Sequence, residues 1–182
     1  MDKFRIGIVG AGLIAETAHI PAILKCENAD LGVLIESDIS RASIFKKIVK
    51  LEVPVLRSLG DFKGSLDGVI ISTPNDSHRI LAEECLERGF NVLTEKPLAT
   101  SYNDAVQIQQ KAKEMHLVVM TGFCTRFWPG VKYVRDFIES GFLGKVKRFV
   151  FQYGSSAGWA PVSEYTSRSE ERRVGKECRS RW

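Results

Sequence analysis

Residues 4–15 read Phe4-Arg5-Ile6-Gly7-Ile8-Val9-Gly10-Ala11-Gly12-Leu13-Ile14-Ala15, and much of the architecture follows from them. The first half is a short apolar run typical of a buried strand, and the second half opens a helical pattern. In such a strand–turn–helix, one glycine permits the tight turn, a second lets the backbone approach a diphosphate, and a small residue allows close helix packing. The N–H groups that start the helix then face the anion. We therefore predict dinucleotide binding by Gly10, Gly12, Leu13, Ile14 and Ala15.

An acidic residue is expected about 20 residues beyond such a turn, where it accepts a hydrogen bond from a ribose 2′-hydroxyl. Glu36 stands 24 residues after Gly12, at the end of the second apolar run, and Asp38 is the near alternative. A carboxylate at this place repels a 2′-phosphate, which favours NAD, although Arg41 is close enough in sequence to make NADP possible. Enzymes that use S-adenosylmethionine also have a glycine-rich first loop and are the main alternative.

Short β-branched runs alternate with longer helical patterns, which is typical of a parallel sheet covered on both faces. The predicted strands are Phe4–Val9, Leu31–Ile35, a short one near Val53–Leu56, Gly68–Ser72, Asn91–Thr94 and Leu117–Thr121. The predicted helices are Leu13–Lys25, Ser40–Lys50, Ser77–Arg88, Tyr102–Met115 and Pro129–Ser140. Pro21 predicts a kink or restart inside the first helix, and Ser101 predicts an N-cap for the fourth. The fold class is therefore α/β, a Rossmann doubly wound parallel sheet.

We expect residues 1–122 to form the NAD(P)-binding domain and residues 123–167 to be the incomplete start of a second domain. The apolar alternation of Val146, Phe149, Phe151 and Tyr153 predicts a strand of a second sheet. Such a strand has few partners left in the chain, so it would present an exposed apolar edge that is prone to aggregate.

The tail at residues 168–182 differs in character from the rest. It holds six positive and three negative side chains, so it supplies three of the four net positive charges. Its sequence, RSEERRVGKECRSRW, is similar residue for residue to the translation of a common sequencing-library adapter. We therefore expect a non-native tail, and a natural protein that continues differently from about Arg168.

Composition excludes several classes of protein. With 44% apolar residues in 182, the chain can bury a sizeable core, which excludes a disordered or collagen-like protein. Its four cysteines lack a C-x-x-C spacing, so we expect neither a zinc site nor thiol chemistry. No apolar run reaches the ~20 residues of a membrane span. We expect a cytoplasmic protein that binds a small molecule, with no nucleic-acid, membrane or metal partner.

Two more motifs end predicted strands, where open α/β sheets bind ligands. Ser72-Thr73-Pro74-Asn75 ends the fourth strand, and it either binds a ligand or forms only a turn and helix cap. His78 follows at the helix start, where a histidine is more often exposed or capping than catalytic. Glu95-Lys96-Pro97 ends the fifth strand. Desolvation there would lower the pKa of a lysine and suit it to polarise or protonate a substrate oxygen, whereas the alternative is a surface lysine paired with Glu95.

In order and spacing, the motifs of about residues 4–153 resemble the Gfo/Idh/MocA oxidoreductase family, and Glu-Lys-Pro is the most specific of them. They are Gly10-x-Gly12-x-x-Ala15 with His19-Ile20-Pro21, Ser72-Thr73-Pro74-Asn75-x-x-His78, Glu95-Lys96-Pro97-Leu98-Ala99, Gly122-Phe123-x-x-Arg126-Phe127 and Gly141-x-x-Gly144-x-Val146.

The resemblance implies an NAD(P)-dependent dehydrogenase of sugars, cyclitols or related polyols. It also implies that residues 123–167 are the truncated start of a C-terminal α/β substrate domain, which supports a homo-oligomer. It implies that Lys96 is catalytic and lies near the nicotinamide, with a cis bond expected before Pro97. It also places at the cofactor the residues Ser72, Thr73, Pro74, Asn75, His78 and Glu95. It places Arg126 at the cofactor or the substrate. The family's second acid/base, a histidine preceded by an aspartate, has no counterpart in this sequence, so we expect cofactor binding without full activity. The competing function is a non-catalytic NAD(P)-binding or sensing protein.

Overall fold

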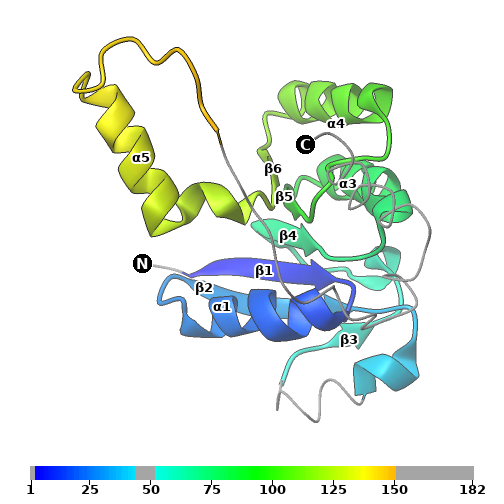
Figure 1. The fold of residues 1–182 in the computed structure, drawn as a ribbon. Coiled ribbons are helices and arrows are strands. Elements are labelled where there is room, and N and C mark those ends of the chain that lie inside the picture. Colours follow the sequence, from blue (N-terminus) through cyan, green and yellow to red (C-terminus); the bar gives the residue numbers. More distant parts are fainter. Residues whose placement is uncertain (1–2, 44–51, 151–182) are drawn as a thin grey trace, which may run out of the picture. The chain divides into compact units, whose positions relative to one another are not determined.

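The computed structural model describes residues 3–43 and 52–150. In this part of the chain, parallel strands form one sheet in the order β3-β2-β1-β4-β5-β6 (Figure 1). The strands are β1 (Phe4–Val9), β2 (Ala29–Ile35), β3 (Val55–Leu56), β4 (Gly68–Ile71), β5 (Asn91–Thr94) and β6 (Val119–Thr121). The predicted Rossmann sheet is therefore confirmed. Its strand order reverses between β1 and β4, and open α/β sheets bind ligands outside the carboxyl ends of the strands at such a reversal.

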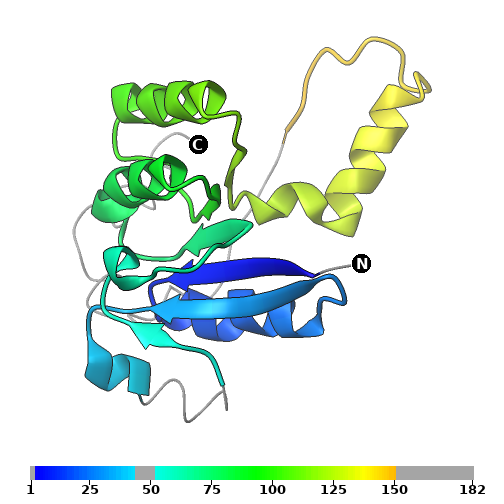
Figure 2. The same cartoon turned by 180° about the vertical axis from the view of Figure 1, so that it is seen from behind.

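Helices cover both faces of the sheet, because neighbouring residues of a strand point to opposite sides. Ile8 packs with the segment η1 (Ala15–His19) and helix α1 (Ile20–Lys25) in one buried cluster. Val9 belongs to a second cluster, with helices α3 (His78–Glu87) and α4 (Tyr102–Glu114). Figure 2 shows α1 beneath the sheet and α3 and α4 on its other side. The central strands are apolar at both alternating positions, and two-sided burial requires this pattern.

The first predicted helix is divided, as expected from Pro21. Ala15–His19 is a π-helical turn, and the α-helix begins at Ile20 with the proline among its first residues. Proline has no N–H to donate, so a helix tolerates it in the first turn and not in the interior. The break places His19 at the end of the wider turn.

The other predicted elements agree with the structure to within one or two residues at most ends. Ser101 caps α4, since its hydroxyl accepts a hydrogen bond from the Asp104 N–H at 3.1 Å. Strand β2 begins two residues before its predicted start, and β6 two residues after. Residues 39–43 are helical, but the rest of the predicted helix Ser40–Lys50 lies outside the described residues.

The chain divides into two compact units after Cys124. The second contains helix α5 (Pro129–Glu139), on which the rings of Tyr133 and Phe137 stack with centroids 6.1 Å apart. The predicted strand at Val146 is wrong as far as the structure describes it, because residues 146–150 have no strand conformation. Isolated strand backbone leaves its N–H and C=O groups unpaired, and the described residues offer this segment no ladder. Phe151 and Tyr153, like the tail at 168–182, lie outside the described residues.

Within residues 3–43 and 52–150, no helix has both the length and the apolar character needed to cross a membrane. The same residues contain no group of three or more acidic, histidine or cysteine side chains placed to hold a metal ion. Cys26, Cys85 and Cys124 are free thiols. Burial raises the pKa of the Cys85 thiol to about 12, so this side chain acts as a small apolar core residue.

Candidate functional site

The glycine turn lies between the carboxyl ends of β2 and β4. Gly10 has φ = 96°, and its N–H donates to the Ile35 carbonyl at 2.8 Å. The Ser72 hydroxyl donates toward the Gly10 and Val9 carbonyls at 2.9 and 3.1 Å. A Cβ atom on Gly10 would lie 2.8 Å from the Ser72 carbonyl oxygen, so only glycine fits. Ser72 is buried, and its hydroxyl holds the turn in place.

Gly12 faces open space. A Cβ atom on it would have the Ser72 carbonyl oxygen, 3.9 Å away, as its nearest neighbour. Leu13 and Ile14 follow on the exposed side, with 52% and 40% of their surface accessible, and Ala15 is fully buried against the sheet. The turn therefore has a bare backbone surface toward solvent and a tightly packed base, the arrangement that a bound diphosphate requires.

Glu36 is buried beside this turn. Its Oε2 accepts a hydrogen bond from the Ala11 N–H at 2.9 Å, and its Oε1 accepts one from the Asp38 N–H at 3.0 Å. Asp38 caps the helical residues 39–43 instead. Its Oδ1 accepts hydrogen bonds from the N–H groups of Ser40 and Arg41. Of the two acidic residues expected for the ribose, only Glu36 contacts the glycine turn.

The segment after β4 folds as a 3₁₀ turn, η3 (Asn75–Ser77), directly before α3. Its hydroxyl groups are linked, since Thr73 Oγ1 lies 2.7 Å from Ser77 Oγ, and the Ser77 hydroxyl donates to the Pro74 carbonyl at 2.7 Å. Thr73 and Asn75 are half-buried, and Pro74 is exposed. The turn is thus rigid and stands at the same edge of the sheet as the glycine turn.

His78 departs from the sequence-based expectation of an exposed or capping histidine. Its side chain is fully buried, and the two ring nitrogens face the carbonyl oxygens of Thr73 and Pro97. His78 begins α3 directly after η3, and its ring lies between the segments that follow β4 and β5. The motif indicated the position of this histidine, and only the folded chain shows what it contacts.

Glu95 joins the fifth strand to the first helical segment. Its Oε1 lies 2.9 Å from His19 Nε2, and its Oε2 accepts a hydrogen bond from the Lys96 N–H at 3.2 Å. The hydrogen bond from His19 holds the pKa of the Glu95 carboxyl below its usual value, although partial burial acts in the opposite direction. His19 is a site residue that sequence reasoning did not single out; the only signal was its place in His19-Ile20-Pro21.

Lys96 follows Glu95 at the carboxyl edge of β5. The side chain is exposed, so the desolvation considered for it from sequence is absent in this structure. The Lys96–Pro97 peptide bond is cis, as expected. Lys96 therefore stands at the carboxyl edge of the sheet, on a loop whose backbone is held by the Glu95 carboxylate.

We expect the Glu95 carboxylate to make stability depend on acid pH. Because its pKa is lower in the folded chain than in the unfolded one, its contribution is present above about pH 4.5 and is lost as pH falls through the folded value. Urea unfolding should show Glu95→Gln less stable than the unsubstituted chain by about 1–2 kcal/mol at pH 7, with a smaller gap at pH 3. Glu114→Gln, at an exposed position of α4, is the control and should show no such change. An equal gap for Glu95→Gln at both pH values would contradict the assignment.

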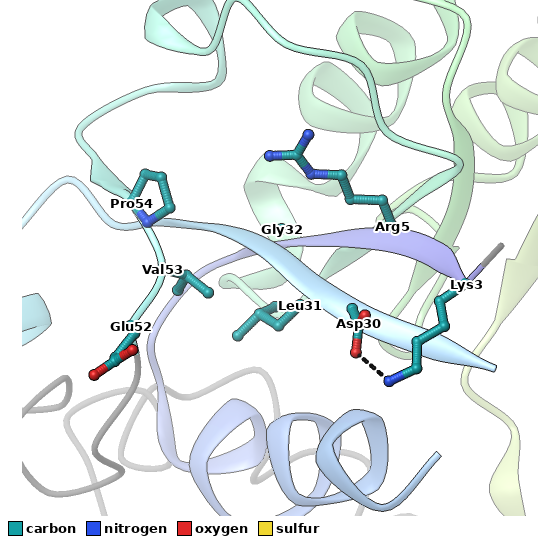
Figure 3. Close-up of a pocket in the computed structure, with 8 residues that line it drawn as sticks. All are labelled: Lys3, Arg5, Asp30, Leu31, Gly32, Glu52, Val53 and Pro54. Carbon is teal, nitrogen blue, oxygen red and sulfur yellow. Dashed lines mark hydrogen bonds and ion pairs between the residues drawn. The ribbon is translucent and has the colours of Figure 1, made fainter. Parts of the chain in front are cut away.

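Arg126 lies in the 3₁₀ turn η4 (Cys124–Phe127), is exposed, and belongs to the second unit. Its expected contact with cofactor or substrate stays a prediction. A separate hollow lies at the opposite edge of the sheet, at the amino ends of β1 and β2 (Figure 3). There the Lys3 ammonium pairs with the Asp30 carboxylate at 2.9 Å. This hollow contains none of the motifs described above.

Known proteins are similar to most of this chain over part of their own length. It is 29% identical over 153 residues to inositol 2-dehydrogenase of Corynebacterium glutamicum, covering 79% of this chain and 43% of the relative. It is 31% identical over 144 residues to 2,7-anhydro-N-acetylneuraminate hydratase of Mediterraneibacter gnavus, covering 79% and 34%. The WlbA dehydrogenase of Bordetella pertussis, solved with NADH and UDP-GlcNAcA, is 26% identical with a TM-score of 0.72, covering 78% and 43%.

The chain thus spans less than half the length of these relatives. Residues 4–123, about two thirds of the chain, match the oxidoreductase family with an NAD-binding Rossmann fold that is named after Gfo, Idh and MocA. The motifs behind the sequence resemblance lie largely inside this range, and the structure brings the glycine turn, Glu36 and Glu95-Lys96-Pro97 to one edge of one sheet. This chain is a member of the Gfo/Idh/MocA family of oxidoreductases.

Proposed function

We propose that the chain binds NAD(H) at the carboxyl edge of this sheet, as the cofactor half of a dehydrogenase that acts on a secondary alcohol or ketone of a sugar, cyclitol or related polyol. One observation carries the proposal: the glycine turn, Glu36 and Lys96 lie at the carboxyl edge of one parallel sheet, around the point where the strand order reverses. Ligands of open α/β sheets bind at that point.

The residues present fit a dinucleotide. Glu36 accepts from the N–H groups of Ala11 and Asp38 and from the Ser37 hydroxyl. A carboxylate has about four acceptor sites, which leaves about one for a ribose hydroxyl. The open space over Gly12 admits a diphosphate, and the exposed Leu13 and Ile14 offer apolar surface beside it. The loop after β4 contains Thr73, Pro74 and Asn75, and it lies on the other side of the strand reversal from Glu36. We assign this loop to the nicotinamide half of the cofactor. When bound, the nicotinamide supplies or accepts the hydride.

Lys96 is the residue that we assign to the reacting oxygen. An ammonium group there stabilises the negative charge that develops on the oxygen during hydride transfer. Glu95 and His19 hold the Lys96 backbone, so the lysine starts from a defined position. A residue outside this chain would move the proton. Among the relatives, a dehydrogenase and a hydratase are named at similar identity, so the net reaction depends on more than this half.

Titration of this chain with NADH tests the proposal directly. We expect a saturable change in NADH fluorescence that excess ADP reverses, because ADP carries the adenosine and diphosphate that occupy the glycine turn. S-adenosylmethionine should give no heat of binding in calorimetry. Failure of the folded chain to bind NADH would refute the proposed function, and binding of S-adenosylmethionine alone would point to a transferase.

Glu36→Gln should reduce the preference for NADH over NADPH. A carboxylate ~4 Å from a 2′-phosphate costs about 1–4 kcal/mol, which corresponds to a preference of roughly 5- to 1000-fold in the unsubstituted chain. Glutamine removes the charge and retains an acceptor for the Ala11 N–H, so the ratio of the two dissociation constants should approach unity. Asp38→Asn, at the helix-capping position, is the control and should leave the ratio within about twofold. An unchanged ratio in Glu36→Gln would exclude Glu36 as the discriminating residue.

A further inference from the structure

The imidazole of His78 lies between the two loops that flank the nicotinamide side of the proposed cofactor site. Its Nδ1 is 2.7 Å from the Pro97 carbonyl oxygen, and its Nε2 is 2.9 Å from the Thr73 carbonyl oxygen. Its side chain is fully buried. One side chain of α3 therefore contacts the backbone of the loop after β4 and of the loop after β5.

These contacts come where the sheet ends. The paired register of β4 and β5 closes at Ile71 and Thr94, and the Glu95 N–H still donates to the Ile71 carbonyl at 2.9 Å. Thr73 and Pro97 each lie two residues beyond that last bond. The His78 ring thus links the loops after β4 and β5 just beyond the last hydrogen bond between the two strands.

The chemistry of the ring decides what this link can do. Carbonyl oxygens only accept hydrogen bonds, so the imidazole must donate. A neutral ring donates to one loop in either tautomer, and a protonated ring donates to both. With both nitrogens turned to the protein backbone and no accessible surface, the ring presents nothing to a ligand. The direct cofactor contact expected for His78 from sequence is therefore replaced by an indirect one.

We propose that His78 is a positioning residue, which sets the spacing between the Thr73 turn and the Lys96 loop so that the nicotinamide half of the cofactor fits between them. The inference rests on the proposed function. Glu36 and the glycine turn, which serve the adenosine half, are held by contacts of their own with β2 and β4. Loss of the His78 link should therefore affect one half of the dinucleotide and spare the other.

The experiment compares NADH with ADP, which lacks the nicotinamide riboside, on the unsubstituted chain, His78→Leu and His78→Gln. Leucine fills the space without donating, and glutamine retains an N–H donor. Ile108→Ala, at a fully buried position of α4, is the control for general destabilisation. Dissociation constants are measured by NADH fluorescence and ADP calorimetry at a temperature where circular dichroism shows every variant folded.

In His78→Leu we expect NADH to bind about tenfold more weakly and ADP within about twofold of normal, with NADH binding largely restored in His78→Gln. Ile108→Ala should leave both constants unchanged. Equal weakening of both ligands in His78→Leu, or unchanged NADH binding, would overturn the inference while the proposed function stands. If the unsubstituted chain binds neither ligand, the proposed function fails and this inference with it. Should His78→Leu not fold, His78→Asn replaces it, because the shorter amide cannot span both carbonyls.

Discussion

Replacing Lys96 with methionine should lower turnover by about 10²–10³-fold in an enzyme that carries its substrate domain, while the dissociation constant of NADH changes by less than about twofold. Methionine has a similar length and no charge, so the substitution removes the ammonium group that we assign to the developing alkoxide. Lys96 is exposed just beyond β5, so the fold should tolerate the change. Steady-state NADH formation with a panel of inositols and sugars measures turnover, and fluorescence titration measures binding.

Two further variants make this result specific. Lys96→Arg keeps the positive charge and should recover part of the lost turnover, although the planar guanidinium changes the hydrogen-bond geometry. Lys113→Met removes an exposed lysine of α4 that belongs to none of the site motifs, and it should leave turnover unchanged. Equal turnover in Lys96→Met and the unsubstituted enzyme would remove Lys96 from the mechanism and leave NADH binding as the function of this unit.

The second large effect is expected at Gly10. Gly10→Ala should lower the free energy of unfolding by about 2–4 kcal/mol and weaken NADH binding by at least about 100-fold. The new Cβ would have to occupy a left-handed backbone with φ = 96° and would stand 2.8 Å from the Ser72 carbonyl oxygen. Relief requires the turn to move away from β4, and the diphosphate site moves with it. Urea unfolding and NADH titration check the two parts.

Substitutions at two other glycines separate the backbone strain from the steric contact with Ser72. Gly89 has φ = 80° with nothing within 4 Å of a new Cβ, so Gly89→Ala reports left-handed strain alone, about 1 kcal/mol. Gly12→Ala should cost less than about 0.5 kcal/mol in stability, because its Cβ would have only the Ser72 carbonyl oxygen, 3.9 Å away, within 4 Å. It should weaken NADH binding about tenfold, because on our proposal the diphosphate approaches this backbone. A loss of stability in Gly10→Ala no larger than in Gly89→Ala would contradict the proposed contact with Ser72.

Local patterns explain why so much of the first unit was predictable. Strands Phe4–Val9 and Asn91–Thr94 were predicted with the bounds that the structure has, because most of their residues are apolar or β-branched in spite of Arg5 and Asn91. Ser101 and Pro21 act within one helical turn of their own positions, so their effects were visible in the sequence. The same reasoning failed at Val146, since an alternating pattern forms a strand only when a partner strand is in reach.

The sequence by itself determined the class of fold, the position of the glycine turn and the family, because each depends on motifs whose residues lie within a few positions of one another. Only the tertiary structure decided how the site is held together. Glu95 meets His19 across 76 positions, Glu36 meets the Ala11 N–H across 25, and His78 spans two loops. Such contacts arise when separate strands end at one edge of a sheet, and no local pattern records which side chains will face each other there.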